Sequence, residues 1–84
     1  MNVKLKLFAS LADYLPPEAQ ATSSLPLRLA PGTTVGEVIA VRRLPEKSCH
    51  LVLINGVFVP QAERAARALA EGDELAIWPP VAGG

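Results

Sequence analysis

The chain has 84 residues, with eight Lys plus Arg balanced by eight Asp plus Glu, so its formal net charge is zero. This length indicates one domain with a small core, and the apolar half of the composition is enough to fill that core. Nucleic-acid-binding proteins normally carry a basic excess, so the balanced charge argues against that class. We expect a single domain over residues 1–84, with residues 79–84 as its tail.

Cys49 is the single cysteine, which excludes an intramolecular disulfide and a cysteine-rich zinc site. No apolar run approaches the roughly 18 residues of a membrane span, and the N-terminus lacks the apolar block of a secretory signal. We therefore expect a cytoplasmic protein without metal or membrane contacts. His50 follows Cys49, but neighbours on a strand point to opposite faces, so a plain buried thiol is expected rather than a nucleophile–base pair.

Two strands are predicted in the N-terminal third of the chain. Residues 3–8 alternate apolar and polar side chains, so that one face is aliphatic and the other carries lysines. Residues 25–29 resume this alternation, and Pro26 restricts them to a sheet edge or a strand start. Between the strands we expect a helical turn over residues 10–15 and a loop over residues 18–24, which make a loose hairpin with a long connection.

One main helix is predicted after the second strand. Thr34 and Glu37 have the spacing of a capping box, in which each residue bonds the backbone amide of the other. The apolar face of the helix comprises Val35, Val38 and Ile39. Pro45 is expected to end it after about ten residues, a length that is stable only when packed against a sheet. The arginines expected to be solvated are Arg42, Arg43, Arg64 and Arg67.

Three further strands are predicted in the C-terminal half. Residues 51–54 are an apolar strand, and residues 55–56 (Asn-Gly) are a strong hairpin signal that leads into a short return strand over residues 57–59. Residues 60–70 contain at most a helical turn. Residues 74–78 alternate again, and the side chains predicted to point inward are Leu75 and Ile77.

This order of elements predicts an α+β fold, with one helix against a mixed sheet of four to five strands. The first and last strands have the cleanest aliphatic alternation, so we place them at the centre of the sheet. Two hairpins around one main helix are typical of the β-grasp, or ubiquitin-like, fold, here with a flexible C-terminal tail.

The last six residues are the most informative part of the sequence. Gly83 and Gly84 leave almost no side-chain bulk beside the terminal carboxylate, which suits entry into a narrow active site of a partner. Pro79 and Pro80 restrict the stem toward extended conformations. Six extended residues reach roughly 20 Å, far enough to hold the terminus away from the domain.

Several stretches together resemble a known family. They are residues 6–9 (Lys-Leu-Phe-Ala), 34–37 (Thr-Val-Gly-Glu), 55–56 (Asn-Gly), 72–74 (Gly-Asp-Glu) and 78–84 (Trp-Pro-Pro-Val-Ala-Gly-Gly). The chain resembles the MoaD/ThiS sulfur-carrier proteins, and most of all the MoaD type, the small subunits of molybdopterin synthase. It departs from that pattern in its short helix and in the apolar Val57.

The resemblance implies a carrier rather than an enzyme. An E1-like adenylyltransferase, similar to MoeB or ThiF, would use ATP to adenylate Gly84, next to the slender Gly83. A sulfur donor enzyme would then convert the adenylate to a thiocarboxylate. In molybdopterin (molybdenum cofactor) biosynthesis this thiocarboxylate would enter a MoaE-like large subunit and donate its sulfur. The resemblance implies no permanently bound cofactor.

Other functions remain open at this point. The carrier could serve thiamine synthesis, cysteine synthesis or tRNA thiolation. It could instead be a ubiquitin-like modifier conjugated through Gly84, or an interaction module without chemistry at its tail. The alternation of side chains along the first and last strands places two aromatic residues on the face opposite the aliphatic side chains, next to the root of the tail. An exposed aromatic pair there suggests a partner-binding surface. The predicted partner-binding residues are Phe8, Trp78, Pro79, Pro80, Val81 and Ala82.

Overall fold

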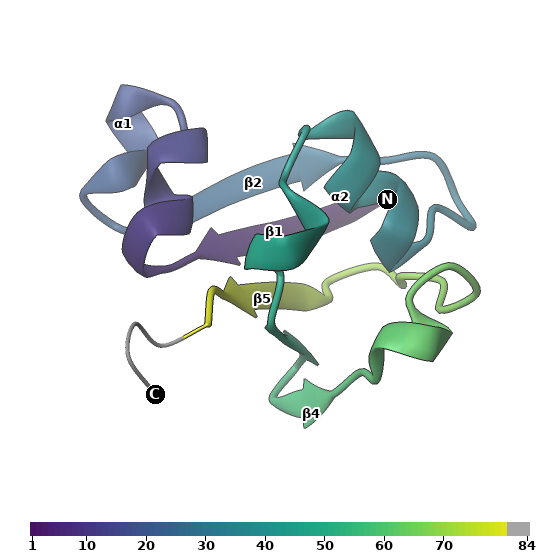
Figure 1. The fold of residues 1–84 in the computed structure, drawn as a ribbon. Coiled ribbons are helices and arrows are strands. Elements are labelled where there is room, and N and C mark those ends of the chain that lie inside the picture. Colours follow the sequence, from purple (N-terminus) through teal and green to yellow (C-terminus); the bar gives the residue numbers. More distant parts are fainter. Residues whose placement is uncertain (81–84) are drawn as a thin grey trace.

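A computed structural model describes residues 1–80 of the chain. A five-stranded mixed sheet in the order β2-β1-β5-β3-β4 carries the main helix α2 on one face (Figure 1). The strands are β1 (Asn2–Leu7), β2 (Ser24–Arg28), β3 (Leu51–Ile54), β4 (Val57–Phe58) and β5 (Glu74–Trp78). The α-helices are α1 (Pro17–Gln20) and α2 (Val35–Val41), and 3₁₀ helices lie at Ala9–Tyr14, Glu46–Ser48 and Gln61–Glu63. This is the predicted β-grasp fold.

The first and last strands lie side by side in the middle of the sheet, as predicted. β1 pairs in parallel with β5 and antiparallel with β2. β5 pairs antiparallel with β3, which forms the short hairpin with β4. β2 is an edge strand, in agreement with the restriction that Pro26 imposes.

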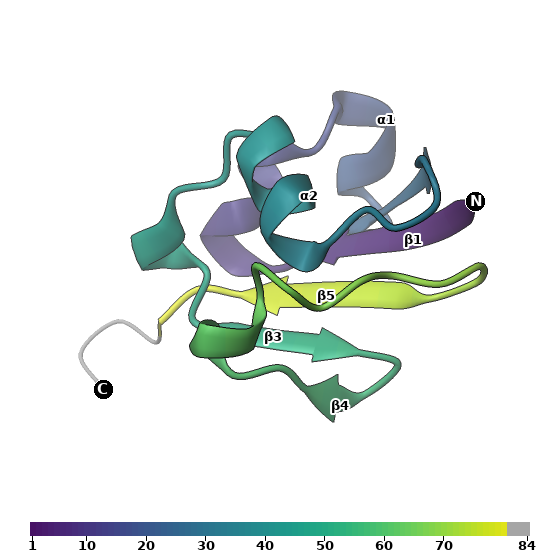
Figure 2. The ribbon, with the colours of Figure 1, turned by 90° about the vertical axis from the view of Figure 1, so that its right-hand side faces the viewer.

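The core lies between the sheet and the helices, which share one side of the sheet (Figure 2). Its largest fully buried side chains are Leu5, Leu7, Leu11, Val35, Val52, Ile54, Leu75 and Ile77. Complete burial of each such side chain contributes about 1.5–3 kcal/mol of transfer free energy. The inward positions predicted for β1, α2 and β5 are all confirmed. None of the helices within residues 1–80 is long and apolar enough to cross a membrane.

The predicted start of α2 is confirmed, but its predicted end is wrong. The amide of Glu37 donates to Thr34 Oγ1 at 3.2 Å, and the amide of Thr34 donates to Glu37 Oε1 at 2.9 Å, which completes the capping box. The helix has seven residues and ends before Pro45, because Arg43 adopts a left-handed conformation with φ of 57°.

Arg43 occupies the position that glycine usually takes after a helix. Its amide donates to Ala40 O at 3.1 Å, and the amide of Leu44 donates to Ile39 O at 3.0 Å. These two bonds form a Schellman motif. Leu44 is buried in the core, so packing at this position holds the turn although Arg43 is not glycine.

The predicted loop over residues 18–24 is also partly helical. Pro17 opens the short helix α1, where its missing amide hydrogen costs nothing. Ala19 is buried on the core, and its amide donates to Pro16 O at 2.9 Å. One small apolar residue in a polar stretch is therefore enough to dock this turn.

Candidate functional site

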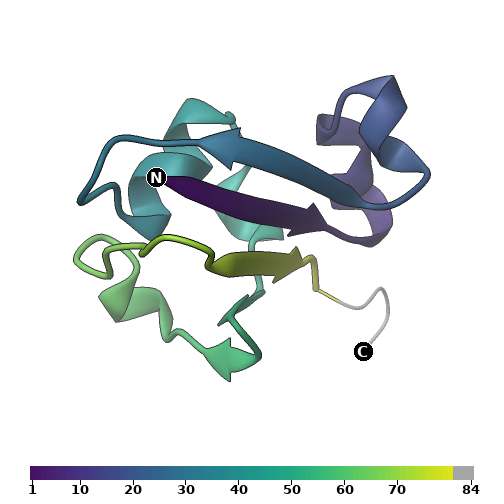
Figure 3. The same ribbon diagram turned by 180° about the vertical axis from the view of Figure 1, so that it is seen from behind.

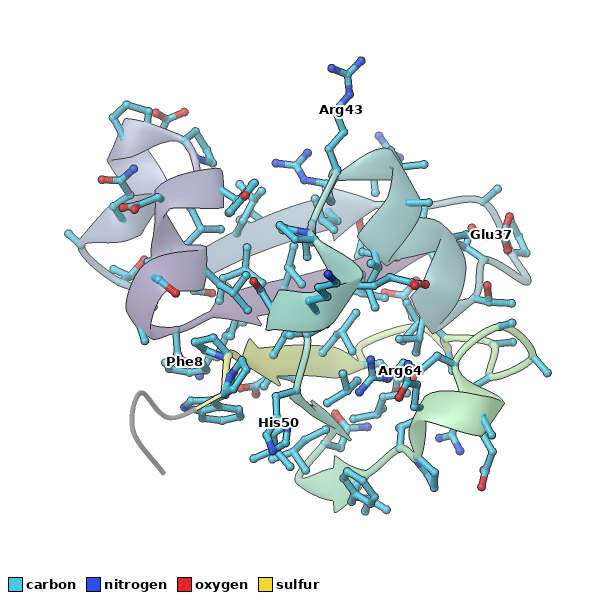
Figure 4. All side chains as sticks on the ribbon, in the orientation of Figure 1. Phe8, Glu37, Arg43, His50 and Arg64 are labelled. Atoms are coloured by element: carbon cyan, nitrogen blue, oxygen red, sulfur yellow. The ribbon has the colours of Figure 1, made fainter. Side chains whose placement is uncertain are left out.

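Phe8 and Trp78 stack against each other at the root of the tail. Phe8 directly follows β1, and its amide donates to Ile77 O at 3.2 Å, which extends the parallel pairing by one residue. The two ring centroids are 4.1 Å apart, with an angle of 7° between the ring planes. Both residues are partly exposed. Figure 4 shows Phe8 beside the carboxyl end of β5, from which Pro79 and Pro80 continue.

This aromatic pair belongs to a larger apolar surface that β3, β4 and β5 form together. It lies on the face of the sheet that α2 does not cover, and Figure 3 shows the ribbon from that side. Cross-strand partners project to the same face of a sheet. Trp78 pairs with Leu51, and Leu53 pairs with both Ala76 and Phe58. We name this surface the outer-face patch. Its residues are Phe8, Leu51, Leu53, Phe58 and Trp78, and they surround the buried Ala76.

Charged side chains border the outer-face patch on β1 and at the start of β5. Lys6 Nζ lies 2.8 Å from Glu74 Oε1, and Lys4 is exposed beside them. The hydrogen bond from Lys6 lowers the pKa of Glu74 below its ordinary value, and the nearby charges of Lys6 and Lys4 act in the same direction. Of the two lysines on the polar face of β1, Lys6 thus forms an ion pair.

Arg64 is buried, which corrects the expectation that it is solvated. Its side chain is 8% exposed, and its Nη2 donates to the carbonyl oxygen of His50 at 3.3 Å. Its Nε has no hydrogen-bond partner within residues 1–80. Figure 4 shows Arg64 directed into the protein, whereas Arg43 projects away from it. Arg64 therefore links the segment after β4 to the residue that precedes β3.

Cys49 is a buried thiol, as expected. It is 3% exposed, whereas the adjacent His50 is exposed. Burial raises the pKa of Cys49, which the positive charge of Arg64 opposes and the negative charge of Glu46 reinforces. A buried thiol with a raised pKa is a poor nucleophile. Among residues 1–80, no three His, Cys, Asp or Glu side chains are grouped so as to hold a metal ion.

The described residues thus place an apolar surface at the root of the C-terminal stem. A family model described as the ThiS family matches residues 5–84. The chain belongs to the ThiS family. Members of this family are small sulfur carriers or ubiquitin-like proteins that are not themselves catalysts. A comparison with curated protein sequences gives no significant match.

Solved structures of two kinds resemble this ThiS-family chain. The small archaeal modifier protein 1 (SAMP1) from Methanosarcina acetivorans is 33% identical, with a TM-score of 0.63 over 99% of this chain and 96% of that one. SAMP1 from Haloferax volcanii is 28% identical, with a TM-score of 0.67 over 100% of both chains. A complex of subunits 1 and 2 of the molybdopterin-converting factor from Helicobacter pylori matches at 17% identity, with a TM-score of 0.60 and full coverage of both chains, and supports the fold alone.

The ThiS-family match confirms the broad resemblance seen in the sequence, whereas the narrower likeness to the MoaD type stays a prediction because the solved structures divide between the two kinds. The structure brings the predicted Phe8 and Trp78 together, with Pro79 and Pro80 directly after them. The other predicted site residues, Val81, Ala82, Gly83 and Gly84, lie outside the described residues.

Sequence reasoning missed the contribution of the β3–β4 hairpin to the outer-face patch. Leu51, Leu53 and Phe58 had not been predicted as site residues. A signal was present, because all four residues of β3 are apolar. Such a run is typical of a strand with both faces covered. Here only one face is covered by the core, so the other face of β3 leaves apolar side chains for a partner.

Proposed function

We propose that this chain is a sulfur carrier that reacts through the carboxylate of Gly84. An E1-like adenylyltransferase of the MoeB/ThiF type would use ATP to adenylate Gly84. A sulfur donor enzyme would replace the adenylate with sulfur and leave a thiocarboxylate. The observation that carries this proposal is the ThiS-family match, which runs through the Gly-Gly pair to residue 84. AMP is a good leaving group from the adenylated carboxyl of Gly84. The groups that would stabilise nucleophilic attack on that carbonyl would belong to the partner enzyme.

The outer-face patch is the proposed docking surface for these partners. It lies at the root of the stem, so a partner that covers Phe8 and Trp78 would receive the tail at a fixed distance from its binding surface. Aromatic residues are enriched in the buried centres of interfaces. Val81, Ala82 and Gly83 would pass through the partner's entrance, for which small side chains are suited.

Molybdopterin biosynthesis is the proposed destination of the sulfur. In that pathway a MoaE-like large subunit would take up the thiocarboxylate tail and catalyse transfer to the pterin precursor. The support is the residue pattern of the tail together with the fold shared with the Helicobacter pylori complex of subunits 1 and 2 of the molybdopterin-converting factor. Carriers for thiamine, cysteine or tRNA thiolation share the same tail chemistry and are separated by their acceptor.

A second candidate function is conjugation of Gly84 to lysines of other proteins. It is favoured by the identity of 28–33% to solved SAMP1 structures, which are described as small archaeal modifier proteins. Activation by an E1-like enzyme is common to both functions. They differ in the nucleophile that takes the activated carbonyl, which is sulfur in one case and a lysine amine in the other.

Mass spectrometry of the intact protein from its native host tests both functions. Exchange of one carboxylate oxygen for sulfur raises the mass by about 16 Da and identifies the carrier. Larger species in which the C-terminal peptide of this chain is joined to a lysine of another protein identify the modifier. A chain that lacks Gly84 should retain its fold and show neither product. If that variant still supports sulfur transfer in its host, the proposed role of Gly84 is wrong.

A further inference from the structure

Arg64 is a buried cation whose hydrogen bonds are incomplete in the described part of the chain. Its Nη2 donates to His50 O at 3.3 Å, but its Nε has no hydrogen-bond partner within residues 1–80. The one ion pair among those residues joins Lys6 to Glu74, so none of their carboxylates neutralises Arg64 at contact distance. Burial of a charge without an ionic partner costs folding free energy. The presence of Arg64 at this position therefore calls for an explanation other than stability.

The backbone of Arg64 is held against the main helix. The amide of Gly36, in the first turn of α2, donates to Arg64 O at 2.9 Å. A Cβ at Gly36 would approach Ala65 Cα at 3.3 Å and Arg64 O at 3.4 Å, so a larger residue there would push the two segments apart. The amide of Val35 donates to Arg67 O at 3.0 Å and holds the same segment at a second point. The Arg64 side chain therefore extends from a backbone that α2 fixes in place.

The far end of the Arg64 side chain is connected to the root of the C-terminal stem through His50. The carbonyl of His50 accepts from Arg64, and the amide of His50 donates to Trp78 O at 3.0 Å. Trp78 is the last residue of β5, and the stem continues from it as residues 79–80. In Figure 4 His50 lies between Arg64 and Phe8, whose ring stacks on that of Trp78. His50 is thus held by Arg64 at its carbonyl and holds the end of β5 with its amide.

We propose that Arg64 is a positioning residue, which holds His50 against Trp78 and so sets the direction in which residues 79–80 leave the sheet. Both stem residues are prolines and have no amide with which to pair with a neighbouring strand. The direction of the stem is therefore set at the end of β5, by the bond from His50 on one side and the bond from the Phe8 amide on the other. The bond from His50 is the one that a buried charged side chain supports.

The consequence for activation of the tail rests on the proposed function of Gly84. The outer-face patch would dock the E1-like partner, whereas Arg64 would aim the stem toward the active site of that partner. A misdirected stem slows adenylation without weakening docking, because a displacement of about 1 Å in a reacting complex can cost on the order of 100-fold in rate. Loss of Arg64 should therefore lower kcat and leave KM unchanged, in contrast to a substitution that weakens docking and raises KM.

The first test is amide hydrogen exchange in the full chain carrying Arg64→Met, followed by nuclear magnetic resonance. Apolar replacement of a buried ionic group by a residue of similar volume is often neutral for stability. Because His50 loses the contact at its carbonyl, its amide should exchange about ten-fold or more faster than in the wild-type protein. The Asn55 amide, which donates to Glu74 O at the opposite end of the β3–β5 pair, should keep its rate. Equal acceleration of both amides, or an unchanged rate at His50, overturns the proposal.

The second test is adenylation by the E1-like partner of the host, measured as exchange of pyrophosphate into ATP. Arg64→Met should lower kcat about ten-fold or more and change KM for this chain by less than about two-fold. Arg67→Met is the matched control, because Arg67 is exposed on the same segment, and should retain the wild-type kcat. Full activity of Arg64→Met, or a raised KM with an unchanged kcat, overturns the proposal.

A second variant keeps both tests decisive. Arg64→Lys retains a cation but not the planar fork of the guanidinium, so its exchange rate at His50 and its kcat should lie between those of Arg64→Met and the wild type. It replaces Arg64→Met in both tests if that variant does not fold. A wild-type chain that no E1-like enzyme adenylates would overturn the proposed function of Gly84, whereas the exchange measurement needs no partner and decides the role of Arg64 by itself.

Discussion

The Asn55 side chain donates to Asp73 Oδ1 at 2.8 Å and so joins the turn of the β3–β4 hairpin to the loop that leads into β5. Its Oδ1 also accepts the amide of Glu74 at 2.9 Å, and Asp73 Oδ2 accepts the amide of Ala70 at 2.8 Å. Asn55 has a φ of 51°, in the left-handed region. One residue therefore supplies the conformation of a hairpin turn and the register of the neighbouring strand.

Two substitutions at Asn55 separate these contributions. Asn55→Gly keeps access to positive φ but removes both side-chain hydrogen bonds, and should lower the free energy of unfolding by about 1–2 kcal/mol. Asn55→Ala also strains the turn and should cost about 1 kcal/mol more. Urea denaturation of both variants provides the measurement. Equal losses would show that the left-handed conformation of this residue adds no strain.

Arg43→Gly should stabilise the protein. Arg43 has a φ of 57° in the Schellman motif after α2, a conformation that costs a non-glycine residue about 1 kcal/mol. We expect a gain of about 0.5–1 kcal/mol in the free energy of unfolding, measured by urea denaturation. Arg42→Gly is the matched control, because Arg42 has a right-handed conformation with φ of −79°, and should be neutral or destabilising. The reverse order of the two variants would contradict this account.

The ion pair between Lys6 and Glu74 should be visible in a titration. The hydrogen bond from Lys6 holds the pKa of Glu74 below its ordinary value, so Lys6→Met should raise that pKa. Lys4→Met should raise it less, because Lys4 is the weaker influence. Nuclear magnetic resonance of the Glu74 carboxyl against pH distinguishes the two variants.

The lowered pKa of Glu74 also determines how the contribution of this carboxylate to folding stability changes with pH. The folded state holds the ionised carboxylate more favourably than the unfolded chain does, so this stabilisation is present above the ordinary pKa of 4.5 and disappears as the pH falls through the lower folded value. The acid sensitivity contributed by this pair should be absent in Lys6→Met. An unchanged titration of Glu74 in that variant would contradict the assignment.

Cys49 should report the opening of the core. It is 3% exposed and burial raises its pKa, so a thiol reagent at pH 7 should label the native protein slowly and the urea-unfolded chain rapidly. Val52→Ala leaves a cavity beside the sheet and should accelerate native-state labelling at least ten-fold. Rapid labelling of the native wild-type protein would show that the thiol is accessible without unfolding.

The outer-face patch should govern activation of the tail. Phe58→Lys places a charge within the patch at a 54% exposed position, and should reduce adenylation of the chain by its E1-like partner about ten-fold or more. Val57→Lys, at the neighbouring 65% exposed position outside the patch, should retain most of the activity. Partner-dependent exchange of pyrophosphate into ATP measures both. Equal activities would remove the patch from the docking surface.

The features that local patterns specify were predicted from the sequence. The alternation in β1 and β5 identified the central strands, because only residues with one buried face show a strict period of two. The capping box of Thr34 and Glu37 and the Asn-Gly turn at residues 55–56 were also predicted, since each depends on residues that are close in sequence.

The features that depend on contacts between distant segments were not predicted. Arg64 resembles any surface arginine until the fold places it against the carbonyl of His50. The left-handed turn at Arg43 that follows α2 depends on the burial of Leu44, and no capping residue in the sequence indicates it. The outer-face patch likewise required the register that sets Leu53 between Ala76 and Phe58, and only the assembled sheet supplies it.

β5 follows all the other strands along the chain, yet it lies third across the sheet, between β1 and β3. Until residues 74–78 have left the ribosome, a nascent chain can form only two separate hairpins, and isolated hairpins are marginally stable. A chain cut short before this point therefore lacks the strand that joins its two hairpins, and we expect it to stay unfolded.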